Sequence, residues 1–184
     1  MAVRVTEVFK KHPDLMDDET VALLESGHHP CDFSGLNLSR TRTQSKAINR
    51  IKGTVCIVAG SGMCTGGRIK HHLLSNIERE ESTILFVGYQ AEGTLGRHIL
   101  SKPDEVRILG NRCKINARIA QINGFSGHAD QEEMTKWLKA ISPAPKKLLL
   151  NHGEEKVALG FAQQLGDELG IESYAPEFEE TIEV

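Results

Sequence analysis

Four clusters of glycine and polar residues contain the side chains of this sequence that could do chemistry. Two of the clusters present a histidine, His98 in segment 88–98 and His128 in segment 125–130. Histidine titrates near neutral pH, so it suits proton transfer, and its neutral imidazole also binds metal ions. Taken alone, however, each histidine is more often an ordinary polar residue, and a zinc site would need three or four protein ligands.

The third cluster is the glycine-rich segment 59–68, which reads AGSGMCTGGR, and the fourth is NHGE at 151–154. Glycines let a backbone approach a phosphate closely, and amides at a helix N-terminus favour an anion. Ser61 and Thr65 add hydroxyl groups, and Arg68 adds positive charge. The Gly-Lys-Ser/Thr ending of a P-loop is missing, so a tight turn without a ligand is an equally good interpretation. The NHGE cluster could orient or bind a group, or only cap the following helix.

Composition and charge limit the class of protein. The chain of 184 residues is 39% hydrophobic and 26% charged with a net charge of −3, which fits a soluble globular protein rather than a cationic nucleic-acid binder. Basic residues gather between 40 and 70, where they could contact phosphates or form a solvated helix face. The chain has no stretch of ~20 apolar residues and no signal-peptide core, so we expect a cytoplasmic protein that does not contact a membrane. We expect ordinary thiols without zinc-finger spacing at Cys31, Cys56, Cys64 and Cys113.

The elements of the first half predict an α/β unit. Residues 54–59 form a continuous apolar run, which indicates a strand buried on both faces that ends in the glycine-rich segment. A helix over about 67–79 and a second buried strand over 84–87 follow. This order predicts a βαβ unit with parallel strands. Earlier helices are expected over 5–11, over 18–25, and from a cap at Thr43 or Ser45 to about 51.

The second half predicts a hairpin followed by further αβ elements. Residues 105–109 and 113–122 indicate two strands joined by a turn at Gly110. A composition change near 93–98 marks the expected domain boundary. The remaining expected elements are a helix over 131–141, a buried strand over 147–150, a helix over 157–169 that ends at Gly170, and short strands over 172–174 and 181–184.

Together, and in this order, the clusters resemble the metallo-β-lactamase/β-CASP nucleases, which include ribonuclease J and the endonuclease subunit of the cleavage and polyadenylation machinery. The resemblance covers about residues 44–184. It rests on SKAIN (45–49), AGSGMCTGGR (59–68), GYQAEGTLGRHI (88–99), FSGHAD (125–130) and NHGE (151–154). Chance agreement with five ordered motifs is improbable.

The resemblance implies a fold and a set of site residues. Residues 1–96 would be the C-terminal part of a β-CASP domain, a parallel βαβ (Rossmann-like) half, and residues 97–184 the C-terminal αβ part of a metallo-β-lactamase domain. RNA would lie in the cleft between the domains and be hydrolysed with help from zinc. His98 is the implied catalytic general acid, and His128 is an implied zinc ligand. The residues implied to bind the RNA are Ser61, Gly62, Met63, Gly66, Gly67, Arg68, Thr94 and Ser126.

The sequence departs from the family in its metal site. The His-x-His-x-Asp-His zinc signature and the motif A carboxylate are absent, so His128 lacks the partners that zinc requires. We therefore expect a chain that is inactive alone, binds no stoichiometric zinc, and needs the missing N-terminal half of the nuclease as its partner. Two alternatives stay open. One is a non-catalytic RNA- or phosphate-binding module, and the other is a scaffold that forms a homo-oligomer through the exposed faces of incomplete sheets.

Overall fold

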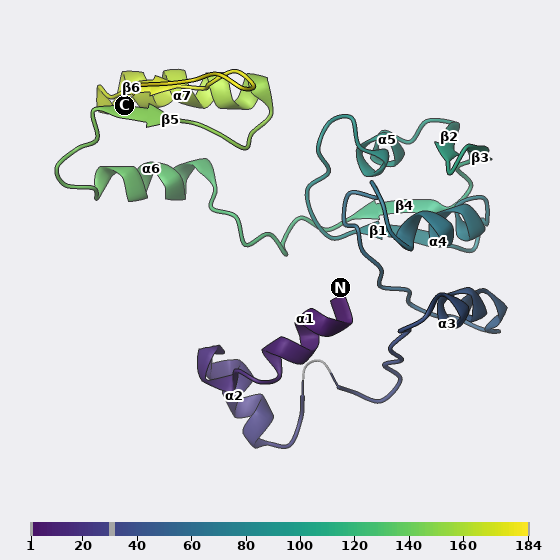
Figure 1. Ribbon diagram of the computed structural model, residues 1–184. Coiled ribbons are helices and arrows are strands. Elements are labelled where there is room, and N and C mark those ends of the chain that lie inside the picture. Colours follow the sequence, from purple (N-terminus) through teal and green to yellow (C-terminus); the bar gives the residue numbers. More distant parts are fainter. Residues whose placement is uncertain (1, 30–31, 184) are drawn as a thin grey trace.

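The computed structural model describes residues 2–29 and 32–183, which form three parts along the chain (Figure 1). The N-terminal part contains α1 (Ala2–Phe9), α2 (Asp18–Glu25) and α3 (Arg42–Ala47), with 3-10 turns at Pro13–Leu15 and Ile48–Arg50. Within the described residues, no helix is both long enough and apolar enough to cross a membrane. The predicted thiol at Cys31 lies outside the part of the chain that the structure describes.

Helix α3 begins earlier than predicted. The expected caps at Thr43 and Ser45 are wrong, because Thr41 is the N-cap of this helix. The hydroxyl of Thr41 accepts a hydrogen bond from the Gln44 amide at 3.1 Å, and the side-chain oxygen of Gln44 accepts one from the Thr41 amide at 2.9 Å. This reciprocal capping box satisfies two backbone donors at once, so it is favoured over a single cap one turn later.

The central unit contains two helices, a pair of parallel strands and a hairpin (Figure 1). Strand β1 pairs in parallel with β4, and β2 pairs antiparallel with β3. The predicted hairpin around Gly110 is thereby confirmed. The elements are α4 (Ile69–Asn76), β1 (Thr83–Phe86), α5 (Leu95–Leu100), β2 (Glu105–Ile108), β3 (Asn111–Lys114) and β4 (Arg118–Gln121).

The predicted strand over 54–59 is wrong, and the βαβ unit built on it does not form. This segment has no regular secondary structure, and the side chain of Val58 is 93% exposed. A strand needs a neighbour for its N–H and C=O groups, and no strand pairs with this segment within 32–183. The parallel partner of β1 is instead β4, which follows β1 in the sequence.

The predicted long strand over 113–122 divides into β3 and β4 for a similar reason. The amides of Asn116 and Ala117 both donate to the carbonyl of Ile77, at 3.1 and 2.9 Å, just beyond the end of α4. These bonds turn the chain out of the hairpin and align Arg118 with Thr83 at the start of the parallel pair. A long-range contact with a helix end therefore overrides the local strand pattern.

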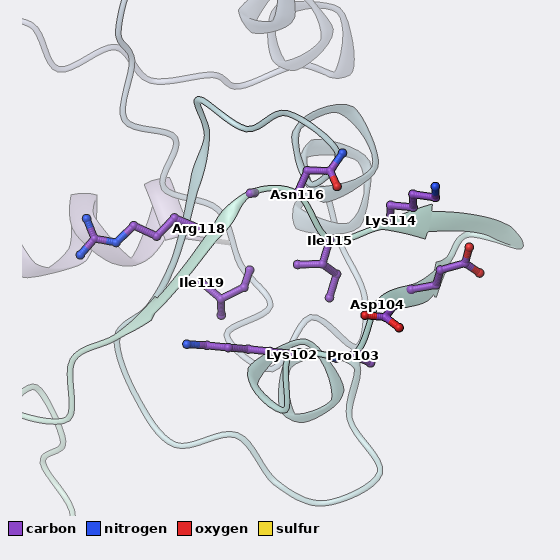
Figure 2. A pocket seen from close by; sticks show the side chains of 10 residues that line it. Lys102, Pro103, Asp104, Lys114, Ile115, Asn116, Arg118 and Ile119 are labelled. Atoms are coloured by element: carbon purple, nitrogen blue, oxygen red, sulfur yellow. The ribbon is translucent and has the colours of Figure 1, made fainter.

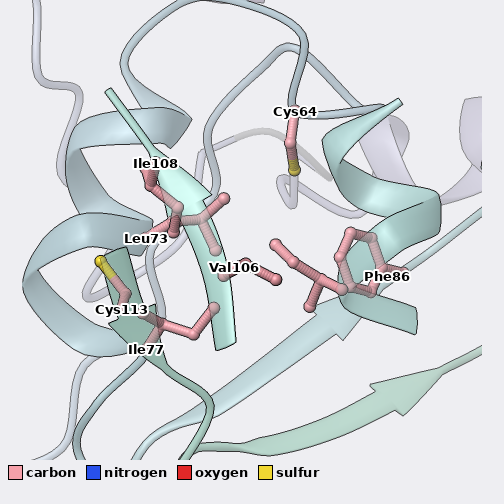
Figure 3. Packing of buried hydrophobic residues seen from close by; sticks show 8 residues of the cluster. Cys64, Leu73, Ile77, Phe86, Val106, Ile108 and Cys113 are labelled. Atoms are coloured by element: carbon pink, nitrogen blue, oxygen red, sulfur yellow. The ribbon is translucent and has the colours of Figure 1, made fainter. Parts of the chain in front are cut away.

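The core of the central unit draws side chains from almost every element (Figure 3). Leu73 and Ile77 from the α4 region and Ile108 from β2 are at most 1% exposed. Full burial of such a side chain contributes about 1.5–3 kcal/mol. The glycine-rich segment enters the same core through Cys64, which is buried, and burial raises the pKa of this thiol. The loop is thus anchored to the core at its centre.

The C-terminal unit has a separate small core. Its elements are α6 (Gln131–Lys139), β5 (Lys147–Leu149), α7 (Glu155–Leu169) and β6 (Glu172–Tyr174), and β5 pairs in parallel with β6. Leu138, Phe161 and Leu165 are buried together between the helices and the strands. Gly170 ends α7 with a φ of +66°, as its position predicted.

Some expectations about the strands are corrected. The strands over 84–87 and 147–150 were predicted to be buried, but Leu85 and Leu149 are 49% and 43% exposed. Within the described residues each sheet has only two strands, so packing covers one face. Residues 181–183 form no strand, and Val184 lies outside the described residues. The mixed α/β class with parallel strands is confirmed, whereas the Rossmann-like and lactamase assignments stay predictions.

Candidate functional site

The glycine-rich loop, residues 59–68, folds back on itself. Gly67 has a φ of +74°, and a β-carbon there would lie 2.7 Å from the Gly60 carbonyl oxygen, so only glycine fits without a backbone shift. Across the loop the hydroxyls of Ser61 and Thr65 are 3.0 Å apart. The closed turn thus exposes hydroxyl and backbone groups of the kind that contact phosphate.

Gly96 and Gln90 join this loop to the segment that carries His98. The Gly96 amide donates to the Met63 carbonyl at 3.1 Å, and the Gln90 side-chain amide donates to the Gly62 carbonyl at 3.1 Å. Gln90 is 3% exposed, so its bond is made in a buried setting. A β-carbon at Gly96 would come within 1.8 Å of the Gln90 side-chain oxygen. Two motifs 30 residues apart in the sequence are therefore packed as one structure.

His98 lies on α5 with its side chain exposed. The hydroxyl of Thr94 caps this helix by accepting a hydrogen bond from the Arg97 amide at 3.2 Å, and it donates to the Ala91 carbonyl at 2.6 Å. The His98 amide in turn donates to the Thr94 carbonyl at 3.1 Å. Thr94 therefore fixes the start of the short helix that carries His98, and Gly96 of the same helix contacts the glycine-rich loop.

Arg68 has a structural contact that the sequence did not suggest. Its guanidinium donates to the carbonyls of Ser39 at 2.7 Å and Arg40 at 3.0 Å. These bonds hold the N-terminal part of the chain against the start of α4. Arg40 itself is paired with Glu7 at 2.8 Å, so two of the basic residues between 40 and 70 already have protein partners.

The SKAIN motif contributes a buried polar pair that was not predicted. The Ser45 hydroxyl lies 3.0 Å from Nε2 of His72, and both residues are 7% exposed. Burial, with the nearby charges of His71 and Arg68, lowers the pKa of His72. The pair joins α3 to α4. The sequence contains the His71-His72 dipeptide but gives no sign that His72 pairs with Ser45, which lies 27 residues away.

His128 and His152 are brought together from two separate motifs. Their ring centroids are 6.5 Å apart and their planes differ by 16°. The hydroxyl of Ser126 accepts from the His128 amide at 3.2 Å, so this predicted RNA-binding side chain also shapes the turn. Across residues 2–29 and 32–183, no three His, Cys, Asp or Glu side chains gather as a metal site. The two imidazoles are fewer ligands than zinc needs, so the described residues alone do not fit the metal.

Glu154 connects the C-terminal unit to the central unit. Tyr89 donates a hydrogen bond from its hydroxyl to the Glu154 carboxylate, and a guanidinium nitrogen of Arg97 lies 3.9 Å from the same carboxylate. The hydrogen bond to Glu154 is the main cause that raises the pKa of Tyr89. The NHGE motif therefore contacts the segment that carries His98.

A separate hollow of about 820 Å³ lies between the end of α5 and β4 (Figure 2). Its lining mixes basic and acidic side chains, including Lys102, Asp104 and Arg118. None of the predicted site residues lines it. The predicted residues are instead divided between the central unit, which holds the glycine-rich loop, Thr94 and His98, and the segment that leads into α6, which holds Ser126 and His128.

Two known protein families match the sequence of this chain. Residues 1–99 match the Beta-Casp domain, and residues 112–176 match the Zn-dependent metallo-hydrolase RNA specificity domain. This chain belongs to the metallo-β-lactamase/β-CASP family of RNA-processing nucleases. The resemblance that the five motifs indicated is therefore confirmed.

Several relatives of this β-CASP chain have curated names. Ribonuclease TTHA0252 of Thermus thermophilus is 37% identical over 165 residues, or 90% of this chain. Transcription termination factor FttA of Methanocaldococcus jannaschii is 38% identical over 141 residues, or 74% of the chain. FttA of Methanosarcina mazei is 28% identical over 181 residues, or 95% of the chain. The matched regions cover 37%, 22% and 28% of these relatives, so the β-CASP chain spans well under half of their length.

Proposed function

We propose that this chain is the C-terminal part of a zinc-dependent ribonuclease that hydrolyses RNA phosphodiester bonds, and that it is inactive alone. The observation that carries the proposal is the hydrogen bond from Gly96 to Met63, which packs the glycine-rich loop against the helix of His98. A phosphate-contacting loop beside an exposed imidazole suits the cleavage of a phosphodiester. The name of the Thermus relative, a ribonuclease, supports the same reaction.

In this proposal the residues of the central unit bind the RNA backbone and protonate its leaving group. The Ser61 and Thr94 hydroxyls would contact the phosphate, since the loop of Ser61 packs on the helix that Thr94 caps. Held there, a phosphate places its leaving oxygen within reach of His98. As a water oxygen forms its bond to phosphorus and the bond to the leaving oxygen breaks, the protonated His98 imidazole would donate its proton to the leaving oxygen. We also propose that the other predicted residues of the glycine-rich loop, and Ser126, contact the RNA.

In this proposal zinc is bound by the complete enzyme and not by this chain alone. His128 would be one ligand, and the others would come from the preceding segment that carries the family's His-x-His-x-Asp-His signature. Zinc supplies Lewis-acid activation in hydrolases of this kind. We also propose the division into domains at 1–96 and 97–184 and a cytoplasmic location. The two-stranded sheets, with open edges, are the surfaces on which the N-terminal half would complete the fold.

The role of His98 is tested directly by substituting it in the complete nuclease. The complete nuclease is this chain joined to the N-terminal segment that would carry the His-x-His-x-Asp-His signature. We expect His98→Ala to lower kcat by about 10²- to 10⁴-fold, because a general acid typically contributes that much. Zinc content should stay the same. His71→Ala is the matched control, since His71 is an exposed histidine on α4. Loss of zinc in His98→Ala, or unchanged kcat, would contradict the assigned role.

A second candidate function is RNA binding without hydrolysis by the chain itself. It is favoured by four exposed basic side chains on and after α3, namely Arg42, Lys46, Arg50 and Lys52. Contacts of such residues with phosphates make RNA affinity fall with salt. The affinity of a single-stranded RNA for the chain should therefore drop between two salt concentrations, and less so after Lys46→Gln and Arg50→Gln. Affinity without salt dependence would exclude this candidate.

A further inference from the structure

Glu154 occupies the N-cap position of α7 but does not cap it. Its side chain makes no hydrogen bond to the amides at the start of that helix. The carboxylate instead points away to the Tyr89 hydroxyl and the Arg97 guanidinium, and it is only 26% exposed. The Glu154 carboxylate therefore makes one hydrogen bond and one ion pair to the central unit and leaves the first amides of α7 uncapped by its side chain.

Both partners of Glu154 belong to the segment that presents His98. Tyr89 follows β1, and Arg97 is the neighbour of His98 on α5. The Arg97 guanidinium also donates to the Gln90 carbonyl at 3.3 Å, and the Gln90 side chain holds the glycine-rich loop. Glu154 therefore contacts a part of the central unit that is already fixed internally, which makes it a firm docking point.

On its own side, Glu154 is close to the paired histidines. It lies two residues after His152, whose ring faces that of His128. Only Gly153 lies between the two residues, and a β-carbon there would make an ordinary van der Waals contact, 3.6 Å from that of Ala158. Because so short a segment joins them, a movement of Glu154 would move His152, and with it the surroundings of His128.

The remaining connection between the units is weak. The linking segment 123–130 has no helix or strand, and the side chain of Phe125 within it is 73% exposed. Within residues 32–183, the side-chain hydrogen bonds and ion pairs that join the central unit to the C-terminal unit all end on Glu154. One carboxylate thus carries the polar docking of one unit on the other.

We propose that Glu154 is a positioning residue. It docks the loops that carry His152 and His128 on the segment that carries His98, and so sets the distance between His98 and His128. The docking itself is a property of this chain, whereas its effect on catalysis rests on the proposed function. Exposed ion pairs usually contribute little to stability. The proposal therefore concerns relative position and not overall stability.

The docking is tested on the 184-residue chain by double electron–electron resonance. Spin labels would be attached at two exposed sites, one on each unit, through Glu80→Cys and Gln163→Cys, in a background that carries Cys31→Ser and Cys56→Ser. We expect a single narrow distance distribution. Glu154→Leu and Tyr89→Phe should each broaden it. The matched control Glu155→Gln, which removes a charge one residue away, should leave it narrow.

The catalytic consequence is tested in the complete nuclease. We expect Glu154→Leu to lower kcat by ~10- to 100-fold with KM within about twofold, since misplacement of a catalytic group has effects of this size. Glu154→Gln should recover part of the loss, because its amide oxygen still accepts from Tyr89. Zinc content and melting temperature should match those of Glu155→Gln.

The outcomes separate the two claims. Equally narrow distance distributions in the chain variants and the unsubstituted chain would overturn the docking role. Broadened distributions with kcat equal to that of Glu155→Gln would overturn the positioning role. A complete nuclease that does not cleave RNA even without substitutions would overturn the proposed function, while the distance measurement would still decide the docking.

Discussion

Gly96→Ala tests whether the glycine-rich loop is packed on α5 as the structure shows. A β-carbon at position 96 would lie 1.8 Å from the Gln90 side-chain oxygen and 3.1 Å from the Met63 carbonyl oxygen. This clash forces the Gln90 side chain to move, and its hydrogen bonds to the carbonyls of Gly62 and Tyr89 are lost. Because Gln90 is buried, water does not replace these bonds.

The expected size follows from opposing contributions. Alanine gains about 0.5–1 kcal/mol over glycine in a helix. Overpacking costs about 1–3 kcal/mol, and each lost hydrogen bond about 0.5–1.5 kcal/mol. With two hydrogen bonds lost, Gly96→Ala should lower the free energy of unfolding by about 3 kcal/mol, with overpacking and the lost hydrogen bonds contributing about equally.

Urea unfolding followed by circular dichroism measures this change. Gly66→Ala is the matched control in the same loop, because a β-carbon there meets no atom within 4 Å and its φ is not positive. The control should stay within about 0.5 kcal/mol of the unsubstituted chain. If Gly96→Ala were as stable as Gly66→Ala, the loop would not be docked on α5, and the phosphate site built on that contact would be refuted.

Three further predictions concern single side chains. An NMR titration of Tyr89 should show a raised pKa, and Glu154→Gln should return this pKa toward the ordinary tyrosine value. Because the pKa is raised in the native state, the hydrogen bond stabilises the fold below the ordinary tyrosine pKa. This stabilisation is lost as the pH rises through the native pKa. The pKa of His72 is lowered in the native state, so the urea midpoint should decline as the pH falls below about 6.5, and His72→Gln should remove part of this decline. Asp130→Ala should cost about 1 kcal/mol of unfolding free energy, since its carboxylate accepts from the Glu133 amide at 2.8 Å as the cap of α6.

Local signals in the sequence predicted much of the fold. The start of α2 at Asp18 and the αL glycine at Gly170 after α7 were expected from single residues and their neighbours. The turn at Gly110 likewise predicted the hairpin of β2 and β3. These features depend on short-range backbone chemistry, which the sequence states directly.

The errors arose where distant residues decide the structure. The apolar run at 54–59 has the composition of a buried strand but lacks a pairing partner in the described residues. The partner of β1 proved to be β4, placed there by bonds to the Ile77 carbonyl. An apolar composition indicates that a segment is able to form a strand, but a neighbouring strand must be present to pair with it.

The same distinction applies to the site. His98, His128 and the glycine-rich loop were selected from the sequence, and the structure packs the loop beside the helix of His98. The roles of Gln90 and Glu154 were missed, because each acts through a side chain that reaches a segment far away in the sequence. The catalytic role of His98, the zinc-binding role of His128 and the RNA-binding role of the loop stay predictions.

RNA cleavage, measured together with zinc content, tests the central claim most directly. The isolated chain and the complete nuclease would each be dialysed, analysed for zinc and incubated with a labelled single-stranded RNA. We expect the complete nuclease to hold zinc and cleave the RNA. The isolated chain should hold less than one zinc per molecule and release no product. Cleavage by the isolated chain, or one tightly bound zinc in it, would contradict the account.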